Sequence, residues 1–166
     1  MTSAETVGNA SQHDVYMRAA LEAARRGMLA GEPPVGACLV ADDRIVATLG
    51  NAVIGELDIT AHAEMRVIRA ACRQLRRLDL SGCTLYVTVE PCRMCLTACH
   101  YAGIDEVIFG ATIDAMNAVT GNELAGGRDA GHEDDSSLQL AGGCLATECR
   151  ALIEAWSGAR PAGAID

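Results

Sequence analysis

The sequence predicts one domain of the α/β class. Apolar stretches with strand and helix periodicity alternate along its 166 residues, the links between them are short, and one domain usually holds roughly 100–200 residues. The order strand, helix, strand favours parallel strands with helices packed on the sheet. We expect this domain at residues 14–158, between a flexible N-terminus at 1–13 and a C-terminal tail at 159–166.

The first elements predicted are a helix and a hairpin. Asp14 can cap a helix over 15–29, whose apolar residues recur near helical spacing. Short apolar runs at 35–40 and 44–49 lie on either side of Asp42-Asp43. Two such runs joined by a turn signal predict a β-hairpin.

A second helix is expected over residues 62–77, after a polar stretch at 50–60. Apolar side chains recur along one of its faces. The arginines on its other faces are Arg66, Arg69, Arg73, Arg76 and Arg77. We expect them to form a solvated face, and the alternative is a stripe that contacts RNA.

The second half of the chain predicts strand, helix and strand before a long loop. Alternation at 83–89 predicts a strand, and Pro91, which a first helical turn tolerates, opens a helix that ends near Ala102. The remaining elements are a strand at 105–110, a polar, glycine-rich loop at 111–137, a short strand at 138–140 and a helix at 145–156.

Charge is distributed unevenly along the chain. It has 13 arginines, no lysine and 22 acidic residues, for a net charge of −9. Residues 1–78 hold nine arginines and nine acids, so the whole excess falls on residues 79–166. Because affinity for nucleic acid comes mainly from Lys and Arg that neutralise phosphates, we expect a small substrate and not a nucleic acid. No apolar run approaches 18 residues and no signal peptide is visible, which predicts a cytoplasmic protein without membrane contact.

Eight cysteines are many for a cytoplasmic chain. A secreted disulfide scaffold is normally shorter and has a signal peptide. Most of these cysteines lie in apolar runs and are expected to be small buried thiols. Cys92 and Cys95 differ, because their spacing can hold a metal ion.

The residues with the clearest chemistry are His62-Ala63-Glu64 and Pro91-Cys92-Arg93-Met94-Cys95. Cysteines at i and i+3 project from one helical face, and the start of a helix favours the thiolate form. Zinc prefers tetrahedral sulfur and nitrogen ligands, so His62 would complete a three-ligand set that leaves one position for water. We predict one zinc ion per chain, with Glu64 beside it as proton shuttle. The combined spacing matches the H-x-E…P-C-x-x-C signature of zinc deaminases.

Other interpretations of these residues stay open. Cys92 and Cys95 could form a redox dithiol, or Cys99 could supply a fourth ligand to a structural zinc ion. A zinc-stabilised binding module is the alternative outside the enzymes, and it would not need Glu64.

The stretch from Pro33 to Ala111 resembles the cytidine deaminase-like superfamily. The motifs that carry the resemblance are Pro33-Pro34-Val35-Gly36, Asn51, Thr60–Glu64, Leu85–Thr88, Glu90–Cys95 and Val107–Ala111. It is most similar to the branch with guanine deaminases, yeast-type cytosine deaminase and tRNA adenosine deaminases. The resemblance implies a three-layer α/β/α sandwich around a five-stranded mixed sheet, and a homodimer.

The resemblance also implies roles for individual residues. His62, Cys92 and Cys95 take the positions of zinc ligands, and Glu64 that of the proton shuttle. Asn51 and the backbone amide of Ala63 match groups that contact the substrate. The implied reaction replaces an exocyclic amine by a carbonyl and releases ammonia.

The substrate is the least constrained expectation. We expect a free nucleobase, a nucleoside or a related small heterocycle, with a guanine-like purine favoured and Asp114 as a further substrate contact. The alternatives are a cytosine-type deaminase and a tRNA-specific adenosine deaminase. The acidic second half, and a departure from the tRNA enzymes' pattern after residue 113, weigh against RNA.

Overall fold

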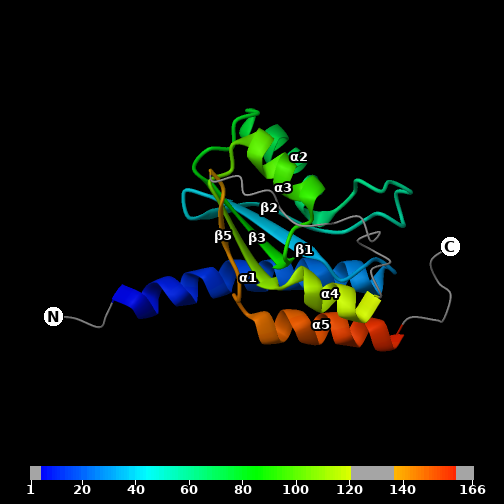
Figure 1. The fold of residues 1–166 in the computed structure, drawn as a ribbon. Coiled ribbons are helices and arrows are strands. Elements are labelled where there is room, and N and C mark those ends of the chain that lie inside the picture. The colour runs from blue at the N-terminus through cyan, green and yellow to red at the C-terminus, as the bar shows by residue number, and fades with distance from the viewer. Residues whose placement is uncertain (1–4, 121–136, 160–166) are drawn as a thin grey trace.

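A five-stranded mixed sheet forms the centre of the molecule (Figure 1). The structure is a computed structural model, which describes residues 5–120 and 137–159. The strands are β1 (Gly36–Ala41), β2 (Arg44–Gly50), β3 (Cys83–Val89), β4 (Glu106–Ala111) and β5 (Gln139–Ala141). Their order is β2-β1-β3-β4-β5; β1 is antiparallel to both β2 and β3, whereas β3, β4 and β5 are parallel. The predicted hairpin and the predicted parallel pairing are both confirmed.

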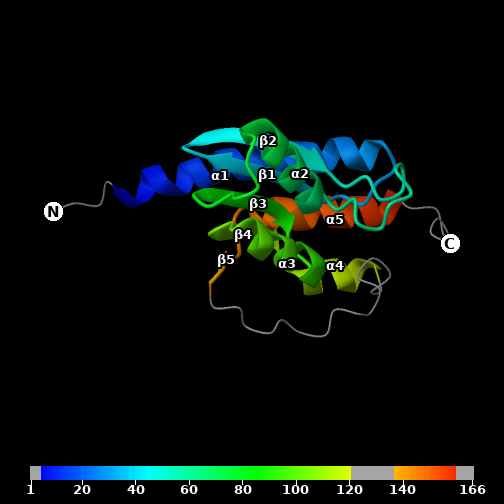
Figure 2. The same cartoon turned by 90° about the horizontal axis from the view of Figure 1, so that it is seen from above.

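Helices cover both faces of this sheet. One layer holds α2 (Ala63–Leu75) and α3 (Arg93–Ala102), and the other holds α1 (Glu5–Leu29), α4 (Ile113–Thr120) and α5 (Ala146–Ala159) (Figures 1 and 2). The predicted three-layer α/β/α sandwich is therefore confirmed. Among the described helices, none is long and apolar enough to cross a membrane.

Alternation along the central strands builds two cores. In β1, Cys38 belongs to the core on the α1 and α5 side, and its neighbour Leu39 to the core on the α2 and α3 side. Tyr86 and Leu85 in β3 divide in the same way. Successive strand side chains point to opposite faces, so both faces of β1 and β3 are apolar and buried.

The largest differences from the predicted helices are an earlier start of α1 and an additional helix, α4, while the ends of α2, α3 and α5 shift by two or three residues at most. α1 begins at Glu5 and not at residue 15. α4 lies within the stretch expected to be a loop, where its first N–H is bound by Glu90 and Met116 packs into the core. The rest of that stretch, residues 121–136, lies outside the described residues, and the domain boundaries at 14 and 158 stay predictions.

Candidate metal centre

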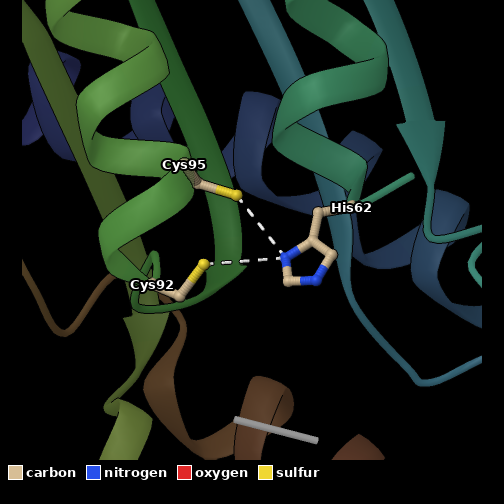
Figure 3. Close-up of side chains that lie close together, drawn as sticks. All are labelled: His62, Cys92 and Cys95. Carbon is tan, nitrogen blue, oxygen red and sulfur yellow. Dashed lines mark hydrogen bonds between the residues drawn. The ribbon is translucent and has the colours of Figure 1, made fainter. Parts of the chain in front are cut away.

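Two of the predicted ligands are the residues at which α2 and α3 begin. His62 is the N-cap of α2 and Cys92 the N-cap of α3, and neither side chain makes the usual capping hydrogen bond. Cys95 follows one turn into α3. Figure 3 shows both cysteine sulfur atoms pointing at the imidazole of His62. The side chains of His62 and Cys92 therefore do not cap their helices but point toward each other.

The distances between these side chains suit a zinc ion. The Nδ1 atom of His62 lies 3.5 Å from Cys95 Sγ and 3.7 Å from Cys92 Sγ. Tetrahedral zinc, with bonds of about 2.0–2.3 Å, places nitrogen and sulfur ligands about 3.5 Å apart. In the described parts of the chain these three residues form the metal-ligating group, and Cys99 is not in it. The donors and the spacing of this group fit zinc, the predicted cofactor, and the assignment of the three residues as its ligands stays a prediction.

Of the two cysteine ligands, Cys92 is the one that the metal-free structure favours as a thiolate, because the hydrogen bond with Cys92 and burial raise the pKa of Cys95. Hydrogen bonds from Cys95 and then from His62 lower the pKa of Cys92 to about 4, against the opposing effect of burial. The same contact with Cys92 raises the pKa of His62. Cys92 is therefore a thiolate at neutral pH, which is the form that binds metal.

Glu64 lies in the first turn of α2, between the ligands and the core. Its side chain is only 3% exposed, and burial raises its pKa to about 7. Its Oε2 atom is buried and has no hydrogen-bond partner in the described structure. A buried carboxyl group with a pKa near neutrality and an open oxygen can both accept and return a proton, as a proton shuttle must. Its catalytic role stays a prediction.

Asn51 links the end of β2 to the start of α2. Its Oδ1 atom accepts the N–H of Ala63 at 2.7 Å, and its own N–H donates to the carbonyl of Val35. Asn51 therefore supplies the capping bond that His62 does not make. The N–H of Ala63 is engaged within the protein, and the roles of both residues toward a substrate stay predictions.

Asp114 is exposed in the first turn of α4. That helix is tied to the segment that carries Cys92, because Glu90 accepts the N–H of Ile113 at 3.0 Å through Oε2. The N–H of Glu90 also donates to the carbonyl of Ala111. Asp114 thus starts an element anchored next to the ligand segment, and its role in substrate recognition stays a prediction.

The sequence analysis missed Glu32. This carboxylate is 5% exposed and accepts the N–H groups of Ile54 at 3.0 Å and Gly55 at 2.6 Å. It fixes the loop that joins Asn51 to His62. In the sequence, a glutamate followed by two prolines indicates only the end of a helix. The contact with Ile54 and Gly55 becomes visible only in the folded structure.

Comparison with known proteins places the chain in a family. Residues 10–111 match the cytidine and deoxycytidylate deaminase zinc-binding region. The tRNA-specific adenosine deaminase of Bacillus subtilis is 35% identical over 146 residues, which cover 88% of this chain and 89% of that relative. The enzyme of the same name from Aquifex aeolicus is 45% identical over 98 residues, which cover 59% of this chain and 65% of its own length.

Solved structures give the same family with two different substrates. A chain from a study of A-to-I editing by tRNA:A34 deaminases at the wobble position is 36% identical, with a TM-score of 0.68, over 82% of this chain and 97% of that one. Guanine deaminase from Bacillus subtilis is 40% identical, with a TM-score of 0.61, over 64% of this chain and 69% of that one.

These relatives correct one prediction. The net charge of −9 led us to disfavour nucleic acid as a partner, and that expectation is wrong, because relatives similar over most of this chain are named as enzymes specific for tRNA. The error lies in using the average charge of a molecule to exclude a local contact. The family match spans more than half of the chain and includes His62, Cys92 and Cys95, whose geometry fits zinc. The chain therefore belongs to the cytidine and deoxycytidylate deaminase zinc-binding family and is a zinc-dependent hydrolytic deaminase.

Proposed function

We propose that this chain deaminates adenosine to inosine in transfer RNA. The observation that carries the proposal is the similarity to the tRNA-specific adenosine deaminase of Bacillus subtilis, which extends over nearly the whole of both chains. The tRNA:A34 deaminase structure supports it with 36% identity over 97% of its length. This substrate replaces the guanine-like purine expected from the sequence.

The proposed chemistry assigns one task to each residue of the site. His62, Cys92 and Cys95 would hold the zinc ion, which when bound would lower the pKa of water toward about 7 and so supply a nucleophile at neutral pH. Glu64 would take one proton from the attacking water and deliver it to the purine ring nitrogen. It would then carry a second proton, from the hydroxyl group added at the ring carbon, to the departing amine. A C–O bond forms at the ring carbon, the C–N bond breaks, and ammonia leaves.

Two of the three metal-ligating residues are partly exposed to solvent. His62 and Cys92 are half-buried, whereas Cys95 and Glu64 are buried behind them. Deaminases of this kind act on a nucleotide that is single-stranded or turned out of a stack. An unpaired anticodon base meets that requirement without the cost of opening a duplex.

The test is deamination by the zinc-loaded protein of an anticodon stem-loop RNA with adenosine at the wobble position. Inosine is measured by chromatography after nuclease digestion, beside a Glu64→Gln variant with its zinc content checked. We expect inosine with the native protein and none with the variant. The same stem-loop with guanosine at the wobble position controls for inosine formed at other adenosines of the RNA.

A second candidate is a guanine deaminase, which the similarity to the Bacillus subtilis guanine deaminase favours over about two thirds of the chain. Free guanine, adenine, cytosine and their nucleosides are therefore assayed in parallel. Turnover of guanine with no inosine in the RNA would overturn the tRNA proposal in favour of this candidate.

A further inference from the structure

Helix α2 leads from the metal centre to a group of exposed arginines. We call this group the arginine row: Arg69, Arg73, Arg76 and Arg77. Arg69 and Arg73 lie one turn apart on the same helical face, and the other two follow where the helix ends. From its N-cap His62 to Leu75 the helix extends about 20 Å at 1.5 Å per residue. The row therefore begins near the zinc ligands and continues away from them along the outer layer.

Acidic partners neutralise other arginines but not this row. The arginines of α1 that lie within 4.0 Å of a glutamate are Arg18, Arg25 and Arg26. Within the described residues, no carboxylate comes that close to a member of the row. Asp58 acts on Arg69 and Asp79 on Arg77 at longer range, so among the residues that the structure describes the four arginines keep an excess of positive charge. The one acid on α2, Glu64, is buried.

Arg76 occupies a position that normally favours glycine. It is the C-cap of α2 with φ 55 and ψ 39, in the left-handed region. Glycine adopts this conformation without steric cost, and a side chain with a Cβ does not. Residues that keep an unfavourable backbone conformation are concentrated where the side chain has a task. Leu57 and Leu145 keep the same conformation, so the backbone alone assigns no task to Arg76, and what it adds to the row is its exposed charge.

We propose that the arginine row binds the phosphate backbone of the RNA substrate while its target base occupies the metal centre. The inference rests on the proposed function for the identity of the polyanion. It explains how a chain with a net charge of −9 can bind RNA, because binding depends on the charge density that phosphates meet locally. Of the acids in residues 79–166, Asp79 acts on the row, at Arg77.

The test measures binding of a fluorescently labelled anticodon stem-loop to the zinc-loaded protein by anisotropy, from about 50 to 200 mM salt. The variants are Arg73→Ala and Arg76→Gly. The control is Arg25→Ala, which removes the same charge from α1 on the opposite face of the sheet. We expect each row variant to bind about two- to fivefold more weakly. The slope of log affinity against log salt should fall by about 0.7–1 for each arginine.

The Arg76→Gly variant separates binding from folding. Its melting temperature should stay equal or rise, because glycine suits the left-handed C-cap, while its affinity for RNA falls. Equal loss in the Arg25→Ala control, an unchanged salt slope, or no RNA binding by the native protein would each overturn the proposal. A change in oligomeric mass that accounts for the lost affinity would also overturn it.

The outcomes separate this proposal from the proposed function. If the native protein forms inosine and the row variants bind RNA as tightly as it does, the tRNA deaminase function is supported and the arginine row is not an RNA-binding surface. Binding that depends on the row, without any deamination, would retain the row as an RNA-binding surface and remove the tRNA deaminase function.

Discussion

Glu64 is a residue whose position favours chemistry over stability. Its buried, unpartnered oxygen costs folding free energy that a neutral side chain would not cost. We expect Glu64→Gln to retain zinc and to melt at the same or a higher temperature. Its turnover should fall by about 10²–10⁴-fold, because an amide cannot carry the proton. Metal analysis, thermal unfolding and inosine formation check this, and activity close to that of the native protein would remove Glu64 from the mechanism.

In the zinc-free protein, we expect the reactivity of the Cys92 sulfur toward alkylating reagents to depend on pH. Its pKa is lowered to about 4, so the reactive thiolate is present throughout the range above that value and is lost only as the pH falls through it. Burial raises the pKa of the Cys144 thiol to about 11. Alkylation followed by mass spectrometry should therefore modify Cys92 at pH 6 and leave Cys144 unmodified, and bound zinc should protect Cys92. Equal modification of the two at pH 6 would contradict this account.

For individual residues, the spacing in the sequence predicted which side chains form the metal centre. It did not predict the hydrogen bonds that hold those side chains in place. His62, Cys92 and Cys95 were predictable because zinc restricts its donors to a few residue types and a tight geometry. The bond from Ala63 to Asn51 was not, since it joins residues that a loop of no fixed pattern separates. The catalytic role of Glu64 and the substrate contacts of Asn51, Ala63 and Asp114 stay predictions.

Among the elements, the loop between β2 and α2 depends on one buried carboxylate. Glu32 accepts two of its backbone N–H groups, from Ile54 and Gly55. We expect Glu32→Ala to speed hydrogen exchange of these two amides and to lower the free energy of unfolding by about 1–3 kcal/mol. The control is Glu22→Ala, since Glu22 is an exposed residue paired only with arginines of its own helix. Unchanged protection at both amides would show that the loop holds itself.

The contact between α1 and the sheet depends on close approach at Gly36. A Cβ at this position would collide with the carbonyl of Ala20 and the backbone of Ala24. Gly36→Ala should lower the free energy of unfolding by about 1–3 kcal/mol, as overpacking does. Gly27→Ala serves as the matched control, because its new Cβ would meet neighbours at 3.7 Å, and it should be neutral or stabilising by about 0.5–1 kcal/mol. Denaturant unfolding compares them, and equal effects of the two substitutions would refute the close approach.

Elements with a strong apolar period were predictable and the others were not. The strand at 83–89 has its predicted bounds because its residues are buried on both faces. α4 escaped prediction because Ile113–Thr120 has little helix propensity of its own. Glu90 and packing against α5 stabilise it instead. The start of α1 was misplaced because Asp14 looks like a cap but lies in mid-helix.

For the whole molecule, the alternation of strands and helices was sufficient to predict the class of fold. The substrate was not predictable in this way, because net charge is a sum over the molecule and recognition is local. Nine of the thirteen arginines precede residue 79: seven lie in α1, β2 and α2, and Arg76 and Arg77 directly follow α2. Only the fold shows which of them acidic neighbours neutralise.

The antiparallel pairing of β1 with β3 joins two parts of the chain, and each part consists of elements that are adjacent in the sequence. Residues 36–75 give the hairpin and α2, and residues 83–111 give the β3-α3-β4 unit. His62 belongs to the first part and both cysteines belong to the second, so a bound zinc ion would cross-link the two parts on either side of the β1–β3 pairing. A bound zinc ion should therefore oppose opening along this contact, and its removal by a chelator should speed hydrogen exchange in β1 and β3.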